Sequence, residues 1–417
     1  MIEAAERARD EGHAAKEVVF SRPMRILHVV SSLDPRYGGT AAAVWAMVRY
    51  GPEGYENEVV TLDDPASAFL RESGVRVHVL GPARFAYCYT PRLVPWLKAN
   101  RDRFDGVVVN GMWQHCGYAV WRTMRGRLPY VVFPHGMLDP YFKRASAAKH
   151  LKKWLYWLAV ECWVLRRAHR VLFTSETESE QAKQSFWLHR WRARVIPFGA
   201  VPPPNEAGDG CDPESAIISG ARREAFFATC PAVRGRRFLL FLGRIDPKKG
   251  CDLLVDAFVK LAGRDTGLDL VMAGPDAGNR RAELMRGAKA AGAAARIHWL
   301  GMLQGDAKWG AFYACEAFVL PSHQENFGVA VAEALACGRP VLLSDKVNIA
   351  AEIACDGAGI MEVDTAAGVE RLLARWINLP AEERAAMSKR ARECFRARYD
   401  MRENAKTIAR IFEKSSG

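Results

Sequence analysis

The chain has 417 residues, of which 49% are hydrophobic and 25% are charged, and its formal net charge is +12 at pH 7. This composition is ordinary for a soluble enzyme, and the length suits two α/β units of roughly 180 residues each. The ten cysteines include no Cys-x-x-Cys pair and no zinc-ligand spacing. A disulfide framework and a metal site are therefore not expected, and a reduced, cytosolic setting is favoured.

The chain opens with a polar extension, residues 1–23, which is rich in Ala, Glu and Arg. We expect either a frayed helix or a misassigned start upstream of Met24, because the apolar core of a signal peptide is missing. A strand pattern at Met24–Val30 then leads through Gly38-Gly39 into a helical run ending at Arg49. A glycine pair after a first parallel strand lets a ligand approach the backbone, although an ordinary tight turn has the same pattern.

A histidine follows the next clear strand pattern. The apolar run that starts at Tyr130 predicts a buried strand, and His135 comes directly after it. Active-site residues of α/β sheets collect at such carboxyl ends, so His135 is a candidate site residue. A histidine with a purely structural role is the alternative.

Much of the positive charge lies in residues 141–170, where positions 143, 144, 149, 152, 153, 166, 167 and 170 are Lys or Arg and Glu161 is the one acid. An apolar stripe with steps of four and three residues predicts an amphipathic helix, and its members are Leu151, Leu155, Leu158, Cys162 and Leu165. Two interpretations stay open. The stripe packs on the sheet as a crossover helix, or this basic, tryptophan-rich surface rests on an anionic membrane. The run Trp154–Leu165 is too short and too polar to span a bilayer.

Three prolines at 202–204, followed by glycines and acids, are the clearest break in the chain. Strand and helix patterns alternate on both sides of this break, which predicts parallel sheets with crossover helices. The predicted units are the extension (1–23), an N-terminal α/β domain (24–201), a linker with a short helix (202–236), a C-terminal α/β domain (237–390) and a last helix (391–417).

The second domain begins with a loop that carries two cations. The strand pattern from Phe238 runs into Gly243 and Arg244, and a proline-containing turn then brings Lys249 and Gly250. A guanidinium fork and a lysine point charge together suit a diphosphate. Solvated cations at a strand end are the ordinary alternative.

The most informative segment is Pro321–Val341, where Glu325 precedes a helix pattern that starts near Phe327 or Gly328. The first N–H groups of a helix are unpaired and its dipole is positive there, so a diphosphate would be stabilised. Glu333 is expected about two turns inside the helix. Carboxylates accept hydrogen bonds from paired hydroxyls, so Glu325 suits a sugar and Glu333 a ribose. Two glutamates on a solvated helix are the alternative.

Glu325 and Glu333 in this setting resemble the E-x7-E motif of the retaining GT-B glycosyltransferases of family 4. The family's G-R-x4-K-G element is matched by Gly243, Arg244, Lys249 and Gly250. His135 is similar to a family histidine that faces the donor sugar. The resemblance runs from about Met24 to the end of the chain, and it departs at Phe198, where relatives commonly have asparagine.

The resemblance implies a GT-B fold, two Rossmann-like domains with a donor cleft between them, and a last helix that packs back on the N-terminal domain. It implies transfer of a hexose from a UDP- or GDP-sugar to a glycan or polyprenyl-linked acceptor, with retention of anomeric configuration and without a divalent metal or other cofactor. Surface polysaccharide synthesis at the cytoplasmic face of the inner membrane is the expected setting. The implied catalytic residues are His135, Arg244, Lys249 and Glu325. The implied donor-binding residues are Gly38, Gly39, Gly243, Arg244, Lys249, Glu325, Asn326, Phe327, Gly328 and Glu333.

Two other functions stay open. A nucleotide-sugar epimerase of similar fold would release a rearranged nucleotide sugar without any acceptor. A nucleic-acid-binding protein would account for the net charge, but the chain has no RNA-recognition, homeodomain or zinc-finger pattern.

Overall fold

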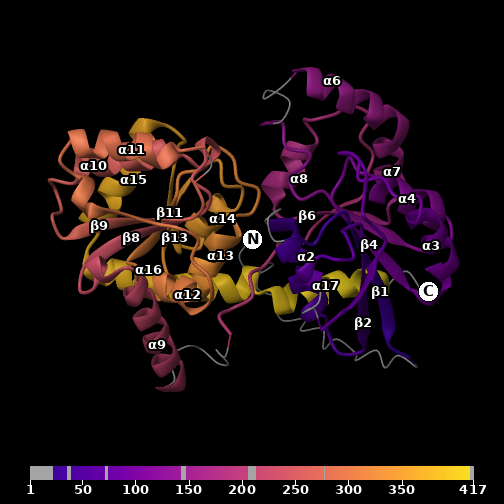
Figure 1. The fold of residues 1–417 in the computed structure, drawn as a ribbon, viewed down its shortest axis with the longest axis horizontal. Coiled ribbons are helices and arrows are strands. Elements are labelled where there is room, and N and C mark those ends of the chain that lie inside the picture. Colours follow the sequence, from indigo (N-terminus) through magenta and orange to yellow (C-terminus); the bar gives the residue numbers. More distant parts are fainter. Residues whose placement is uncertain are drawn as a thin grey trace, which may run out of the picture.

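A computed structural model describes residues 22–34, 39–70, 74–141, 147–204, 213–276 and 278–413. These residues form two α/β domains that lie side by side, each built on one parallel sheet (Figure 1). The predicted fold class is confirmed. Most of the N-terminal extension, and Gly38 of the glycine pair, lie outside the described residues.

The N-terminal sheet has seven parallel strands in the order β3-β2-β1-β4-β5-β6-β7. The strand order reverses between β1 and β4, and ligands of open α/β sheets bind at the carboxyl side of such a reversal. Strands β4 and β5 are buried at every residue, as expected where helices cover both faces. The strands are β1 (Met24–Val30), β2 (Tyr55–Thr61), β3 (Arg76–Val79), β4 (Gly106–Asn110), β5 (Tyr130–Phe133), β6 (Arg170–Phe173) and β7 (Ala193–Val195). The first helices are α2 (Gly39–Arg49), α3 (Leu93–Asn100), α4 (His115–Met124) and α8 (Glu176–Ala182).

The C-terminal sheet has six parallel strands in the order β10-β9-β8-β11-β12-β13, and its order reverses between β8 and β11. The strands are β8 (Arg237–Leu242), β9 (Leu268–Ala273), β10 (Ile297–Leu300), β11 (Ala317–Leu320), β12 (Val341–Ser344) and β13 (Gly359–Glu362). The helices are α9 (Pro213–Thr229), α10 (Cys251–Leu261), α11 (Arg280–Ala290), α12 (Gly305–Ala314), α13 (Val329–Ala336), α14 (Ala350–Cys355), α15 (Ala366–Asn378) and α16 (Ala381–Cys394). Helix α9, expected within the linker, packs on α12, where a Cβ on Gly310 would meet the Arg222 carbonyl oxygen at 1.9 Å.

The helix predicted around residues 151–165 is divided into α6 (Ala147–Tyr156), a π-helical turn (Trp157–Glu161) and α7 (Cys162–Arg167). Its buried residues are Trp157, Glu161, Val164 and Leu165, whereas Leu151, Leu155 and Leu158 are exposed. The interpretation that the whole leucine stripe packs on the sheet is therefore wrong. A π-helical turn adds a residue to the turn and so rotates the stripe out of phase with the buried face.

The chain crosses between the domains at two places that are hydrogen-bonded to each other. The Ala200 N–H donates to the Tyr399 carbonyl at 2.9 Å, and the Met401 N–H donates to the Ala200 carbonyl at 3.2 Å. Helix α17 (Met401–Glu413) then packs on α2 under the N-terminal sheet (Figure 1). It begins later than the expected residue 391, because α16 and a π-helical turn (Phe395–Tyr399) come first.

Candidate functional site

The carboxyl ends of the two sheets face each other. Gln324 Nε2 donates to Asp139 Oδ2 at 2.6 Å, and Asn326 Nδ2 donates to Thr174 Oγ1 at 3.2 Å. Asp139 and Thr174 follow β5 and β6, while Gln324 and Asn326 follow β11. The candidate site therefore lies where the domains meet, next to the reversal of strand order in the C-terminal sheet.

The loop after β8 carries the first predicted cation. Gly243 is held by its N–H, which donates to the Ala273 carbonyl at 2.9 Å. Gly274 (φ 143°) must be glycine, because a Cβ would lie 1.9 Å from the Gly243 carbonyl oxygen. Arg244 is exposed, and it makes no hydrogen bond or ion pair with the residues that the structure describes. Its guanidinium is therefore available to an anionic ligand.

The second cation lies against the Glu325 loop. A short turn, Pro247–Lys249, is capped by the Asp246 carboxylate, and Gly250 follows with φ 65°. A Cβ on Gly250 would lie 2.0 Å from the Pro321 carbonyl oxygen, so glycine allows the two loops to touch. Lys249 Nζ forms an ion pair with Glu325 Oε2, and both side chains are mostly buried.

The Glu325 loop leads into a helix that is open at its N-terminus. The Glu325 N–H donates to the Lys346 carbonyl at 2.9 Å, which fixes the backbone. Gly328 (φ 73°) is the N-cap of α13, and no side chain of the described chain caps that end. The predicted helix start is confirmed. Its first N–H groups can donate hydrogen bonds to an anion. Glu333 lies one turn inside α13, not two, because the helix starts only at Val329.

His135 lies on the N-terminal side of the same interface. Its φ is 51°, and its Nε2 lies 3.3 Å from Asn110 Oδ1. The ring stacks on Phe133 at 5.3 Å between centroids and touches Phe198 at 5.3 Å. Burial lowers the pKa of His135 to about 3, so the imidazole is neutral at pH 7. Phe198 also meets Phe327 at 5.9 Å, so the departure from asparagine puts an apolar contact between the domains.

The structure brings most of the predicted residues together. Arg244, Lys249, Glu325 and the start of α13 surround one place, and Glu333 lies a turn further along the helix. The His135 segment approaches them, since a Cβ on Gly136 would lie 2.8 Å from Asn326. Gly39 starts α2 and is exposed, and a Cβ there would meet nothing within 4 Å. A role for the glycine pair remains a prediction.

Several residues of this region were missed from the sequence. Lys308 on α12 pairs with Glu333 at 2.8 Å, and nothing in its helical pattern distinguishes it from a solvated lysine. Gln324 bridges the domains, which only the fold reveals. The buried Glu178 accepts the Gly136 N–H at 2.7 Å. A signal for Glu178 was present, because Ser175 and Glu178 have the spacing of a helix capping box.

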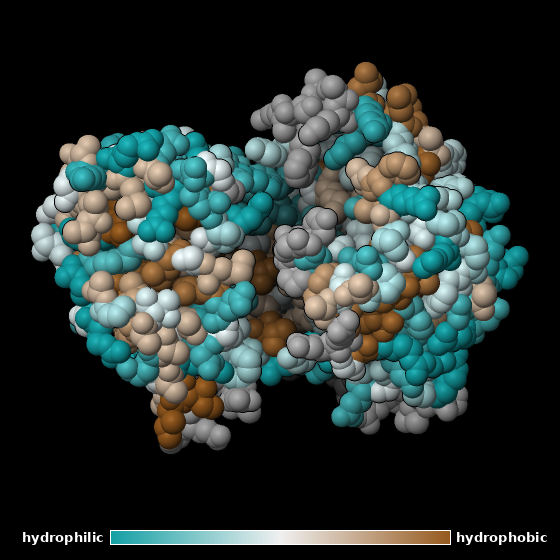
Figure 2. Space-filling view, in the orientation of Figure 1, coloured by the Kyte–Doolittle hydropathy of each residue, from teal (hydrophilic) through white to brown (hydrophobic). Residues whose placement is uncertain are grey.

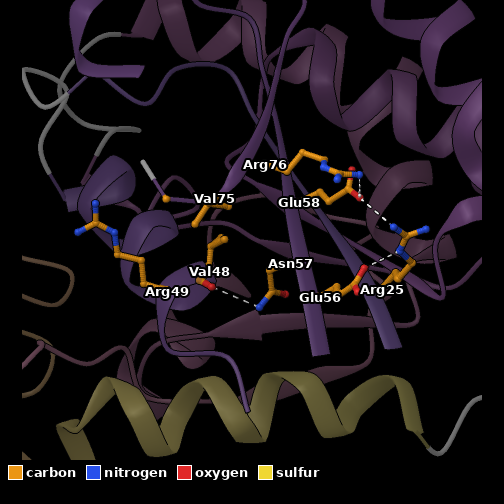
Figure 3. A pocket seen from close by; sticks show the side chains of 9 residues that line it. Arg25, Val48, Arg49, Glu56, Asn57, Glu58, Val75 and Arg76 are labelled. Atoms are coloured by element: carbon orange, nitrogen blue, oxygen red, sulfur yellow. Dashed lines mark hydrogen bonds and ion pairs between the residues drawn. The ribbon is translucent and has the colours of Figure 1, made fainter. Parts of the chain in front are cut away.

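A pocket of about 710 Å³ lies elsewhere, at the amino ends of β1, β2 and β3 (Figure 3). Four of its five charged residues pair among themselves: Arg25 Nε lies 2.9 Å from Glu56 Oε2, and Arg76 lies 3.6 Å from Glu58. It opens at the edge of the sheet opposite to the cleft. Because most of the charges in it are already paired, we do not assign it as the site.

Two paired sheets with a cleft at their facing carboxyl edges define the fold class of the GT-B glycosyltransferases. HepE from Anabaena in complex with UDP has this fold (TM-score 0.70, 19% identity, covering 94% of this chain and 100% of that chain). WaaG, a glycosyltransferase involved in lipopolysaccharide biosynthesis, also has this fold (TM-score 0.64, 17% identity, covering 94% of this chain and 100% of that chain).

Residues 38–199 match the family described as glycosyl transferase 4-like domain, and residues 223–394 match glycosyl transferases group 1. The chain belongs to the group 1, family 4-like glycosyltransferases. It is 31% identical over 186 residues to a D-inositol 3-phosphate glycosyltransferase of Actinosynnema mirum, which is 43% of this chain and 42% of that protein. It is 27% identical over 264 residues to a phosphatidyl-myo-inositol mannosyltransferase of Mycolicibacterium smegmatis, 62% of each. The matches thus span about half the length of these curated relatives.

Proposed function

We propose that the protein transfers a hexose from a UDP- or GDP-sugar to a glycan or polyprenyl-linked acceptor. The observation that carries the proposal is the Lys249–Glu325 pair, which joins the loop that carries Arg244 to the segment that leads into the open N-terminus of α13. Cations and backbone N–H groups there surround a carboxylate that can accept sugar hydroxyls. This combination suits a diphosphate joined to a sugar.

The donor's diphosphate binds Arg244, Lys249 and the first N–H groups of α13. When a phosphate oxygen takes Lys249 from Glu325, the freed carboxylate accepts hydrogen bonds from the sugar hydroxyls. Glu333 accepts the ribose hydroxyls and keeps Lys308 as its neighbour. The cations supply the charge that stabilises the leaving diphosphate, so we expect turnover without a divalent metal.

Transfer proceeds with retention of configuration. The acceptor hydroxyl attacks the anomeric carbon on the side from which the diphosphate departs. The bond from carbon to phosphate oxygen breaks, a bond from carbon to acceptor oxygen forms, and the departing phosphate oxygen takes the acceptor's proton. Neutral His135 hydrogen-bonds the sugar from the facing domain, and Glu325, once freed from Lys249, acts through hydrogen bonds to the sugar hydroxyls and not as a nucleophile.

One of the two named relatives supports a membrane-borne acceptor. The Mycolicibacterium smegmatis relative described above is named as a phosphatidyl-myo-inositol mannosyltransferase, and one neighbouring fold was solved with UDP-glucose. In this chain, Leu151 and Leu155 on α6 are 66% and 68% exposed, and Trp187 is 78% exposed. Trp154 joins the two groups, with its ring 5.9 Å from that of Trp187. Figure 2 shows hydrophobic side chains gathered over α6.

This patch lies among the exposed cations Lys152, Arg166 and Arg167. Apolar side chains with basic neighbours bind anionic lipid surfaces. We therefore place the protein at the cytoplasmic face of a membrane, as a peripheral protein. In the described ranges, no helix is both long and apolar enough to cross a bilayer.

Calorimetric titration of nucleoside diphosphates and their sugars, without metal, tests the donor site. Micromolar binding of UDP or GDP that both Arg244→Ala and Glu333→Ala weaken would support the site and name the base. No binding of any of these ligands would refute the proposal. Product analysis separates the rival reaction, because an epimerase releases a rearranged nucleotide sugar when no acceptor is present.

Sedimentation with lipid vesicles tests the membrane surface. Leu151→Ser combined with Leu155→Ser is expected to lower binding to vesicles that contain an anionic phospholipid. Ile217→Ser is the matched control, because Ile217 is 73% exposed on α9 of the other domain. Equal binding by the double variant and the control would refute the membrane surface and leave the donor site untouched.

A further inference from the structure

Glu178 is a buried carboxylate to which neither the motifs nor the proposed chemistry gives a role. It lies on α8, with 4% of its surface exposed. Its Oε1 accepts the Gly136 N–H at 2.7 Å, and its Oε2 accepts both the N–H and the hydroxyl of Thr174 at 2.7 Å. Each oxygen thus ties down a loop at a strand end, one after β5 and the other after β6.

The first of these loops carries His135. Its positive φ is uncommon for a residue with a side chain, and the surrounding structure must hold it. The bond from Gly136 to Glu178 fixes the peptide that follows His135. Glu178 therefore holds the backbone at His135 without touching the imidazole.

The second loop reaches the other domain. A threonine hydroxyl has one hydrogen, and Thr174 gives it to Glu178, so Thr174 Oγ1 can only accept from Asn326 Nδ2. The amide oxygen of Asn326 is then free to accept from Asn348 Nδ2, at 3.2 Å. The acceptor Glu178 thus fixes the donor and acceptor direction of each bond in this series. Because Asn326 directly follows Glu325, the series ends beside the donor site.

We propose that Glu178 is a positioning residue that fixes His135 of one domain and the Asn326–Glu325 segment of the other in a single geometry. The role rests on the proposed transferase function. No other carboxylate among the described residues bonds both the His135 turn and the loop that meets Asn326. Three hydrogen bonds of 2.7 Å hold both loops.

Glu178→Gln tests the role, because the new amide group donates where the carboxylate accepted. We expect kcat to fall about 10- to 100-fold, the range for a small misplacement of reacting groups. The KM for donor should stay within about twofold, since Arg244, Lys249 and Glu333 are unchanged. Glu180→Gln, an exposed glutamate on the same helix, is the matched control and should match wild type. An unchanged kcat in folded Glu178→Gln would overturn the assignment.

A second pair of variants covers the case in which Glu178→Gln does not fold. Thr174→Val removes the hydroxyl that relays the bond to Asn326 but keeps the bond of Glu178 to Gly136. It should lower kcat, and Thr174→Ser should restore it. Equal turnover by the valine and serine variants would count against a relay through this hydroxyl.

Hydrogen exchange measured by mass spectrometry needs no activity. In Glu178→Gln, peptides that cover Gly136 and peptides that cover Asn326 should both exchange faster, although they belong to different domains. Faster exchange around Gly136 alone would show a local structural role and overturn the proposal. A wild type that transfers no sugar would refute the proposed function, and the exchange result would still decide the role of Glu178.

Discussion

Glu161 offers the sharpest test of the electrostatics, because it is a carboxyl group buried in a π-helical turn. Its Oε1 accepts the Trp113 N–H at 2.5 Å, and burial raises its pKa from 4.5 to about 7. Glu161→Gln keeps an oxygen of the same shape for that N–H and removes the titration. The variant therefore isolates the free energy of placing a charge in this part of the core.

The size and sign of the effect follow from linkage. The pKa of Glu161 is higher in the folded chain than in the unfolded chain, so its neutral form stabilises the fold at low pH. That contribution is complete below about pH 4.5 and is lost as the pH rises through about 7. One pKa unit corresponds to about 1.4 kcal/mol, so a shift of this size corresponds to about 3 kcal/mol. Most of this stability is lost between pH 5 and pH 8.

Urea unfolding followed by tryptophan fluorescence measures the free energy of unfolding at both pH values. Between pH 5 and pH 8, wild type should lose about 2 to 3 kcal/mol relative to Glu161→Gln. Glu180→Gln should follow wild type, because that side chain is exposed. Parallel pH dependence of wild type and Glu161→Gln would refute the argument that burial sets this pKa.

Three further outcomes are expected. Gly136→Ala should lower turnover more than tenfold, because its Cβ would collide with Asn326. Gly126→Ala is the control and should not lower turnover, because Gly126 has a similar positive φ but open space around it. Equal kinetics of the two variants would contradict the close approach of Gly136 to Asn326. Lys249→Ala should lower kcat by about 10²- to 10³-fold in steady-state assays, as for loss of one donor to a developing anion, and an unchanged kcat would remove Lys249 from the site. His135→Gln should lower kcat but leave the shape of the pH–rate profile unchanged from pH 6 to 9, because the pKa of His135 is lowered to about 3; loss of a titration step there would contradict a neutral imidazole.

The strands were predictable because parallel strands covered on both faces form continuous apolar runs. Met24–Val30 has the same bounds in the structure as in the sequence pattern, and the apolar run that starts at Tyr130 forms β5. The burial of α6 was not predictable in the same way. A regular period cannot show a π-helical turn, and that turn decides which leucines face outward.

The site was predictable where its residues are close in the sequence or have a recognisable spacing. Lys249 and Glu325 belong to two such motifs, and the structure pairs them. Glu178 and Lys308 act on residues far away in the chain, so no local pattern shows which partner each will meet. Gln324 has a partner only because two domains close on each other, which depends on tertiary packing alone.

The two crossings between the domains have a mechanical consequence. Because Ala200 is bonded to Tyr399 and Met401, the two crossings are tied to each other at one place and cannot lengthen independently. The domains can therefore rotate about this place, which acts as a hinge. The two hydrogen bonds oppose sliding or separation of the domains there. Opening the cleft must break the Gln324–Asp139 and Asn326–Thr174 hydrogen bonds, whereas the hydrogen bonds at Ala200 stay intact. A substrate that keeps the cleft closed acts far from this hinge. A few hydrogen bonds at the cleft therefore control the rotation of a whole domain.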